Sequence, residues 1–220
     1  MFRQLTDFVT KEKYLQDVYT HTDYRQVACA LAWPWSPSPG CVVVLAERRA
    51  APQYLGEDRH IDVKAETISH SEGELIESVA RLMTLFRVPY VIADVGDERV
   101  SLIDHENDLR RSKRERTLRL QSPYHWEGRG ERALPYYVAL LRRRIVDAKT
   151  LHFSQLSQIP MDAQRVLGTD DTLAATFRLQ ECPSLCALCW ALDALTTQDP
   201  EGSIPYDRVL SGPVDAIGGV

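Results

Sequence analysis

The sequence predicts an α/β domain built on a mixed sheet. Three strand-like runs come first, at residues 26–33, 41–45 and 58–69. An amphipathic helix over residues 71–87 then leads into an apolar strand over residues 88–96. A short turn joins antiparallel strands, whereas a helical crossover joins parallel ones. The order β-β-β-α-β therefore predicts both kinds of pairing in one sheet.

The composition predicts one soluble domain in the reducing cytoplasm. The 220 residues are enough to bury a core without disulfides, and 44% of them are hydrophobic and 26% charged. No apolar run approaches the roughly 20 residues that span a bilayer, so no membrane partner is expected. The amino terminus lacks the pattern of a signal peptide, and the five cysteines lack the spacing of a disulfide framework.

The first two runs predict a β-hairpin. Residues 26–33 and the β-branched run at residues 41–45 are joined by a segment rich in proline, serine and glycine. In the third run, residues 58–69, apolar and polar side chains alternate. Alternation of this kind predicts a strand with one face in solvent.

The helix and strand that follow are the centre of the predicted sheet. Ser71 is a suitable helix cap, and apolar side chains recur after it at three- and four-residue steps. Residues 88–96 are apolar enough for a strand buried on both faces, and Asp94 stands at its carboxyl end. Ligands and metals collect at such strand ends in open α/β sheets, which makes Asp94 a candidate site residue.

The second half of the chain predicts further strands and helices. Residues 97–107 are polar, with a short strand candidate at residues 100–103. The remaining candidates are a strand at 117–121, helices at 131–146 and 154–167, and a last helix at 183–195. This last helix is apolar almost all round, so we expect it to be buried against the sheet.

The predicted organisation is one domain with two appendages. Residues 1–25 predict a helical lead-in, and residues 26–197 form the domain. Residues 198–220 are polar and rich in glycine and proline, which predicts a tail that is loosely held or folds on a partner.

A cluster of cations lies after the polar segment, although the net charge of the chain is −5. Clustered cations on an acidic protein form a patch that favours a polyanionic partner, here DNA or another nucleic acid. A solvated helix face is the plainer interpretation. The cluster comprises Arg110, Arg111, Lys113, Arg114, Arg116 and Arg119.

The order of these elements resembles that of ribonuclease H-like folds, and within them the nuclease domain of phage terminase large subunits. The resemblance covers residues 26–195. It rests on the hairpin, the third strand, the helix at residues 71–87, the Ile-Ala-Asp-Val-Gly end of the fourth strand and the late apolar helix. It implies a ribonuclease H-like mixed sheet flanked by helices. No phosphate-binding loop of an ATP-driven motor is present.

The resemblance also implies two-metal hydrolysis of phosphodiesters. Acids from the first strand, the fourth strand and the late helix of that family hold two Mg²⁺ or Mn²⁺ ions. Asp94 matches the fourth-strand acid and would be a metal ligand if the chain is active. The first strand, however, reads Ala-Cys-Ala-Leu-Ala-Trp over residues 28–33 and offers no carboxylate.

The late helix aligns in two registers. The preferred register places cysteine and proline of residues 181–188 where acids are expected. The second register uses Asp170 and Asp171, which would act with Asp94 in an active enzyme. We therefore expect a catalytically degenerate domain that binds nucleic acid or serves in an assembly and needs no cofactor. Two alternatives stay open: an active endonuclease that uses Mg²⁺ or Mn²⁺, and a protein-interaction subunit that binds no nucleic acid.

Cysteines and aromatic residues give weaker signals. Cys182, Cys186 and Cys189 have the Cys-x3-Cys-x2-Cys spacing of an iron–sulfur ligand set, but cysteine is also a common residue of buried apolar helices. Trp33, together with other aromatics assigned to loops, is a candidate for stacking on bases or for capping the core.

Overall fold

The first three strands form an antiparallel unit. The structure is a computed structural model that describes residues 24–48, 60–94, 96–123, 130–154, 157–169 and 171–197. In it, β1 (Tyr24–Ala32) pairs with β2 (Gly40–Arg48), and β2 pairs with β3 (Ile61–Ser69). The predicted hairpin and third strand are confirmed.

Helical crossovers then add parallel strands on the other side of β1. α3 (Glu72–Leu85) leads to β4 (Val91–Ala93), which is parallel to β1. α4 (Asp97–Ser112) leads to β5 (Leu120–Gln121), which is parallel to β4. The sheet has six strands in the order β5-β4-β1-β2-β3-β6, so the predicted mixed α/β architecture is confirmed.

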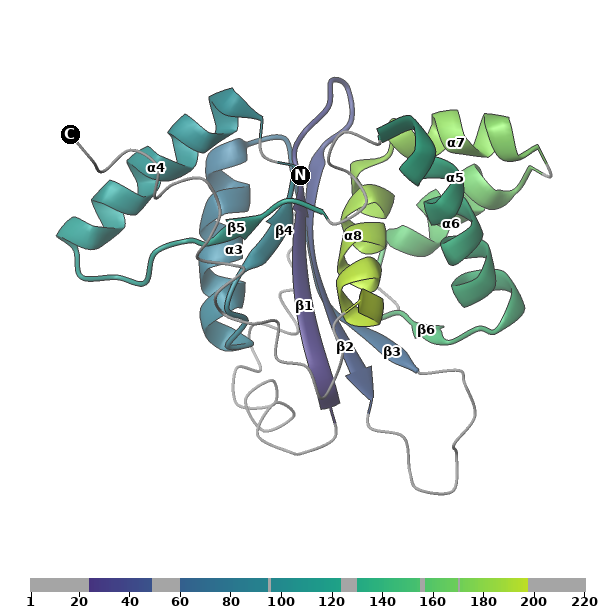
Figure 1. Ribbon diagram of the computed structural model, residues 1–220, viewed down its shortest axis with the longest axis horizontal. Helices are drawn as coiled ribbons and strands as arrows, with labels where there is room; N and C mark the ends of the chain where they lie inside the picture. The colour runs from purple at the N-terminus through teal and green to yellow at the C-terminus, as the bar shows by residue number, and fades with distance from the viewer. Residues whose placement is uncertain are drawn as a thin grey trace, which may run out of the picture.

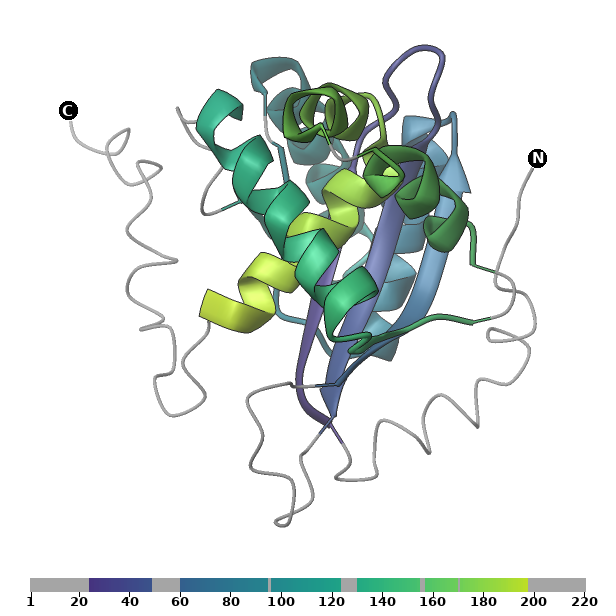
Figure 2. The same cartoon turned by 90° about the vertical axis from the view of Figure 1, so that its right-hand side faces the viewer.

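The second half of the chain is mainly helical. α5 (Gly130–Leu141) continues into the π-helical turn η1 (Arg142–Asp147), and the short strand β6 (Leu151–His152) then joins β3 in parallel. The remaining helices are α6 (Ile159–Leu167), α7 (Thr172–Gln180) and α8 (Pro183–Thr197). α8 packs on β1 and β2, as expected of a late buried helix (Figure 2).

Helices cover both faces of the sheet (Figure 1). Alternate side chains of β1 point to opposite faces: Ala28 and Ala30 face the core under α8, whereas Cys29 and Leu31 face the core under α3. Burial of a large aliphatic side chain contributes about 1.5–3 kcal/mol, so the two cores hold a helical layer on each face. The β4 side chains are buried between these layers, as predicted for the central strand.

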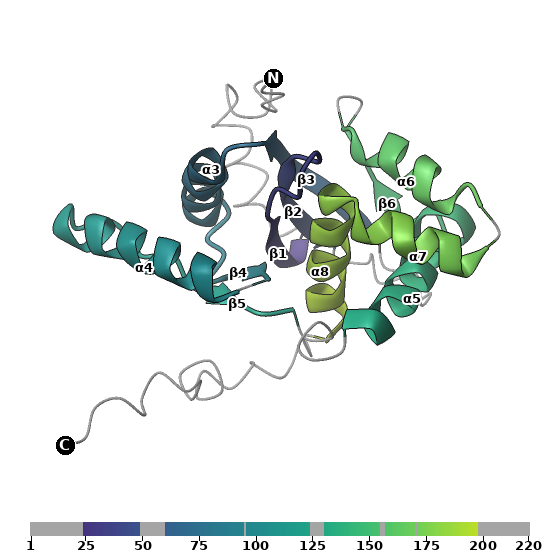
Figure 3. The same cartoon turned by 90° about the horizontal axis from the view of Figure 1, so that it is seen from above.

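Two predictions about local structure are wrong. The strand candidate at residues 100–103 lies inside α4, a helix whose buried side is narrow: Ile103 and Asn107 are buried one turn apart, and most of its other described side chains are exposed. The polar composition of this segment did not predict a helix, because a helix that projects from the surface needs few apolar side chains (Figure 3). The Asn107 side chain fixes its carboxyl-terminal part by bonding to both backbone polar groups of Leu118.

The solvent-facing side predicted for β3 is buried instead. Asp62 and Glu66 are only 8% and 4% exposed. Each has partners, because a buried polar group without a hydrogen bond is costly. Asp62 accepts hydrogen bonds from Arg48 and Tyr24, and Glu66 accepts them from residues at the start of α6. Alternation along β3 therefore reflects specific polar contacts rather than exposure to water.

The predicted appendages lie largely outside the described residues. Residues 1–23 and 198–220 are not described, and β1 already begins at Tyr24. Among the described helices, none combines the length and the apolar character needed to cross a bilayer.

Candidate functional site

Asp94 follows β4 directly and lies beside the end of β1. Leu31 of β1 pairs with Ala93 of β4, and the indole Nε1 of Trp33 donates a hydrogen bond to the Asp94 backbone oxygen at 2.8 Å. The guanidinium of Arg99, from α4, lies 5.4 Å from the centre of the Trp33 ring. Trp33 directly follows β1, outside the strand, and it is buried, so its ring packs in the core. The predicted position of Asp94 at the carboxyl end of a central strand is the observed one.

The positions beside Asp94 on β1 are occupied by small apolar residues. Ala28, Ala30 and Ala32 face the core that contains α8, and all are buried. Alanines on a strand let a helix approach closely, since interiors are packed without large voids. The α8 cysteines fill part of this core. The face on which an acid of β1 would stand is therefore a packed interface.

Cys182, which precedes α8, and Cys186 and Cys189 on α8 are core residues. Burial, and then the charges of Cys182 and Asp94, raise the pKa of the Cys186 thiol far above its ordinary value. The Cys186 thiol also donates to the Leu179 backbone oxygen at 3.3 Å. Burial likewise raises the pKa of Cys182 and Cys189. Metal ligation and nucleophilic attack need the thiolate, which these surroundings disfavour.

The carboxylates proposed as partners of Asp94 do not form a metal site with it in the described part of the chain. Asp171 is the amino-terminal cap of α7, and its Oδ1 accepts a hydrogen bond from the Leu173 backbone nitrogen at 2.9 Å. Asp170 lies outside the described residues. Across the described ranges, no three or more histidine, cysteine, aspartate or glutamate side chains are placed to hold a metal ion.

One buried acid was missed by the sequence analysis. Asp193, on α8, is 1% exposed and lies 3.4 Å from the Tyr136 hydroxyl and 3.5 Å from the Tyr137 hydroxyl, both on α5. Burial, and then the charge of Asp193, raise the pKa of Tyr137. The signal in the sequence was an acid inside an otherwise apolar helix. Its described contacts tie α8 to α5.

The six cations that were predicted to form a basic patch divide into those whose side chains have partners and those whose side chains have none among the described residues. Three of them have partners. Arg110 lies between Glu106, at 2.8 Å, and Glu115, at 3.4 Å, and its side chain is 14% exposed. Arg111 pairs with Asp108 on the surface of α4. Nearby carboxylates thus offset the charge of both residues.

Arg116 is the third partnered cation. Its guanidinium donates to the backbone oxygens of Val88, at 3.0 Å, and Met83, at 3.4 Å. Met83 belongs to the last turns of α3, and Val88 precedes β4. Carbonyl groups at a helix end lack intrahelical partners, so Arg116 satisfies part of this end.

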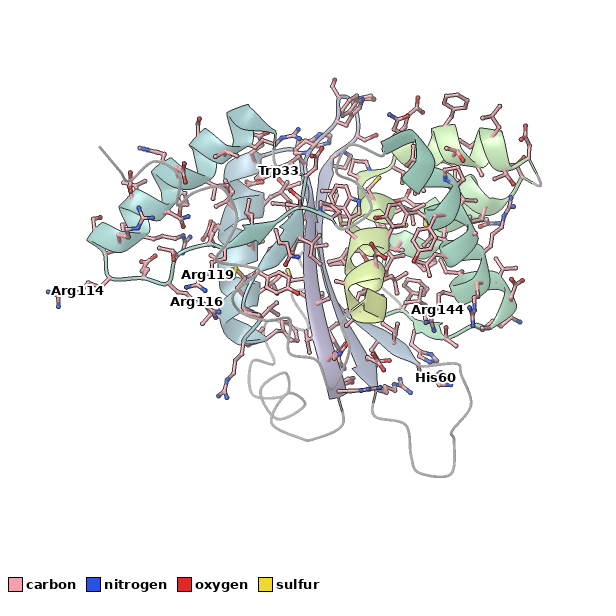
Figure 4. The ribbon with its side chains drawn as sticks, viewed as in Figure 1. Trp33, His60, Arg114, Arg116, Arg119 and Arg144 are labelled. Carbon is pink, nitrogen blue, oxygen red and sulfur yellow. The ribbon has the colours of Figure 1, made fainter. Side chains whose placement is uncertain are left out.

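The other three cations are exposed and have no side-chain partner among the described residues. Lys113 ends α4, Arg114 follows with a left-handed backbone at φ 59°, and Arg119 immediately precedes β5. Arg114 projects from the far end of α4, and Arg119 lies nearer to the sheet (Figure 4). We call Lys113, Arg114 and Arg119 the free cation set.

Comparison with known proteins assigns no family to the chain. No family model matches it, and no curated protein matches its sequence. The arrangement of the described residues is therefore the basis for a function.

Proposed function

We propose that the chain is a ribonuclease H-like domain that resembles the terminase nuclease domain, binds nucleic acid through the free cation set and does not cut it. The observation that carries this proposal is the separation of the basic segment into partnered and free cations. An arginine that already has carboxylate or carbonyl partners gains little from a phosphate, whereas a free cation loses only its hydration. The three free cations come from one segment of seven residues, 113–119.

The sheet supports the ribonuclease H-like part of the proposal. Three antiparallel strands, a helix, a parallel fourth strand and a late helix packed on the sheet follow one another in the order that the resemblance requires. Asp94 occupies the end of the fourth strand, which is the position of an acid in that family.

The surroundings of Asp94 support the absence of cutting. Two hard cations need several oxygen ligands, because the ions must neutralise both the attacking and the leaving oxygen. Here the Trp33 indole bonds to the Asp94 backbone, the adjacent strand β1 contains buried alanines and no carboxylate, and the nearby Cys186 thiol has a raised pKa. A donor set of this kind does not suit Mg²⁺ or Mn²⁺.

Binding through the free cation set is electrostatic and independent of base sequence. Each phosphate contact releases condensed counterions, so the logarithm of the binding constant falls with the logarithm of salt by roughly 0.9 per contact on duplex DNA. Three contacts predict a slope of roughly −2.7.

The test is the binding of a fluorescent DNA duplex by the full chain at several NaCl concentrations. The variant Lys113→Glu/Arg114→Glu/Arg119→Glu should bind about tenfold more weakly or worse at low salt and lose most of the salt slope. A matched control, Lys149→Glu/Arg165→Glu/Arg178→Glu, changes the net charge equally on the opposite helical layer and should bind nearly as wild type. Equal binding by wild type and the first variant, or equal losses in both variants, would contradict the proposal.

One observation favours the protein-interaction alternative. Leu173 and Phe177 are one turn apart on α7, and they are 65% and 61% exposed. Exposed apolar side chains grouped on a helix are common in protein interfaces. If this alternative holds, the wild-type chain binds no duplex DNA at low salt, and Leu173→Asp/Phe177→Asp abolishes a self-association seen by sedimentation.

A further inference from the structure

Two histidines that are distant in sequence meet at the edge of the sheet. His60 immediately precedes β3, and His152 is the last residue of β6. The Nδ1 atom of His60 lies 2.8 Å from the Nε2 atom of His152, the ring centres are 5.0 Å apart, and the ring planes differ by 18°. This nitrogen–nitrogen distance is shorter than the roughly 3.5 Å of a van der Waals contact between stacked rings. The rings are therefore joined edge to edge by an N–H···N hydrogen bond.

Such a bond limits how many protons the pair can hold. One of the facing nitrogens must donate, and the other must accept with its lone pair. A first added proton can bind to the outward nitrogen of the donor ring and leave the bond intact, because the outward nitrogen of the acceptor ring already carries its hydrogen. A second added proton must bind to the facing nitrogen that accepted the bond. Both facing nitrogens then carry N–H groups, and each ring carries a positive charge. The bond then breaks, and the rings repel each other.

Neighbouring elements add mainly positive charge around the pair. Arg48 comes from β2 and Asp62 from β3, and these two side chains are ion-paired at 2.6 Å. Tyr24 of β1 and Lys64 of β3 also contact Asp62. Arg144 of η1 donates to the Thr150 side chain just before β6, on the same side of the molecule as His60 (Figure 4).

The histidine pair holds a strand with very little pairing of its own. β6 is paired with β3 at only two positions, Ile61 with Leu151 and Asp62 with His152. The Ile61 backbone nitrogen also donates to the Thr150 oxygen at 2.8 Å. A two-residue edge strand is marginally stable alone, so one side-chain bond is a large part of what fastens it.

A second, independent attachment holds the next part of the chain. Glu66 of β3 accepts a hydrogen bond from the backbone nitrogen of Gln158 at 3.1 Å, and another from the Ser157 hydroxyl. Release of the histidine pair would therefore free β6 and leave α6 attached to β3.

We propose that His60 and His152 form a pH-sensitive clamp that fastens β6 to β3 near neutral pH and releases it when both rings are protonated. The clamp is independent of nucleic-acid binding. When it is released, the sheet opens locally and reversibly at one edge, between β3 and the helical layer.

The sign of the effect follows from the proton affinity of the folded state. Burial, and then the charges of Arg48 and His60, lower the pKa of His152, against an opposing effect of Asp62. The opened state therefore binds protons more readily than the closed one. The stabilisation is fully present above the ordinary histidine pKa of about 6.5 and is lost as the pH falls below it. One linked proton changes the opening equilibrium by up to about tenfold per pH unit.

Amide hydrogen exchange of the full chain, followed by NMR, tests the clamp. Between pH 7.5 and 5.5, after correction for intrinsic exchange, protection of the Ile61 amide should fall about tenfold, and protection of the Gln158 amide should stay constant. In His60→Gln and His152→Gln, Ile61 should be weakly protected at both pH values. His105→Gln, an exposed histidine of α4, should behave as wild type.

The NMR chemical shifts of the His60 and His152 ring nitrogens give a second measurement, which needs only the wild-type chain. Double protonation of the pair should occur over the pH range in which Ile61 loses protection. A constant Ile61 protection, an unaltered pH dependence in both glutamine variants, or double protonation without loss of protection would overturn the clamp.

Discussion

The guanidinium of Arg116 donates to the backbone oxygen of Val88 at 3.0 Å and so joins the basic segment to the connection between α3 and β4. This contact predicts that Arg116 acts in stability rather than in binding. Arg116→Ala should lower the free energy of unfolding by about 1 kcal/mol, because Arg116 is exposed and water competes for its hydrogen bonds. Urea denaturation measures this change. The same variant should keep the DNA affinity and salt slope of wild type, and a binding loss as large as that of Arg114→Ala would contradict the assignment.

The packed surroundings of Asp94 predict that the chain does not cut DNA. Wild type and Asp94→Ala should both leave supercoiled plasmid intact with Mg²⁺ or Mn²⁺, because no group of three or more metal-ligating side chains forms among the described residues. Gel analysis over a range of metal concentrations measures this. Cutting by wild type that disappears in Asp94→Ala would show the active endonuclease instead. Asp171→Ala would then test whether the cap of α7 also serves the reaction.

The ion pair and hydrogen bonds of Asp62 should make the folded state less stable in acid. Burial alone would raise the pKa of Asp62, but hydrogen bonds from Arg48 and Tyr24 outweigh it, and the pKa lies below its ordinary value. Ionised Asp62 therefore stabilises the fold above pH 4, and this contribution is lost as the pH falls through the lowered value. Asp62→Asn should cost about 1 kcal/mol at pH 7, with the half-exposed Arg48 limiting the effect. Urea denaturation should show the two proteins converging toward pH 2.

The five cysteines predict slow thiol chemistry in the folded chain. All five are buried and free, and burial raises the pKa of Cys29 to about 12. At pH 8 a disulfide reagent should react with them at the rate of unfolding or local opening, and rapidly in urea. Added Zn²⁺ should leave the melting temperature unchanged. A thiol that reacts within seconds under native conditions, or a metal-dependent rise in melting temperature, would show a functional cysteine site.

Local patterns in the sequence determined much of the fold. Ser71 accepts a hydrogen bond from the Glu74 backbone nitrogen, as its place before an amphipathic run predicted. The hairpin and the late apolar helix were also predicted, since their signals lie within one continuous stretch. Periods of two and 3.6 residues are properties of a single strand or helix and need no distant partner.

Tertiary structure decided which side chains are available for function. Arg114 and Arg116 are two residues apart and look alike in the sequence, yet only Arg116 meets the carbonyl groups at the end of α3. His60 and His152 are 92 positions apart and meet because β6 pairs with β3. The sequence alone thus predicted the sheet, the acid at the end of β4 and a basic segment. Whether a charge is free, paired or buried depends on neighbours brought together by folding, and no local pattern contains that information.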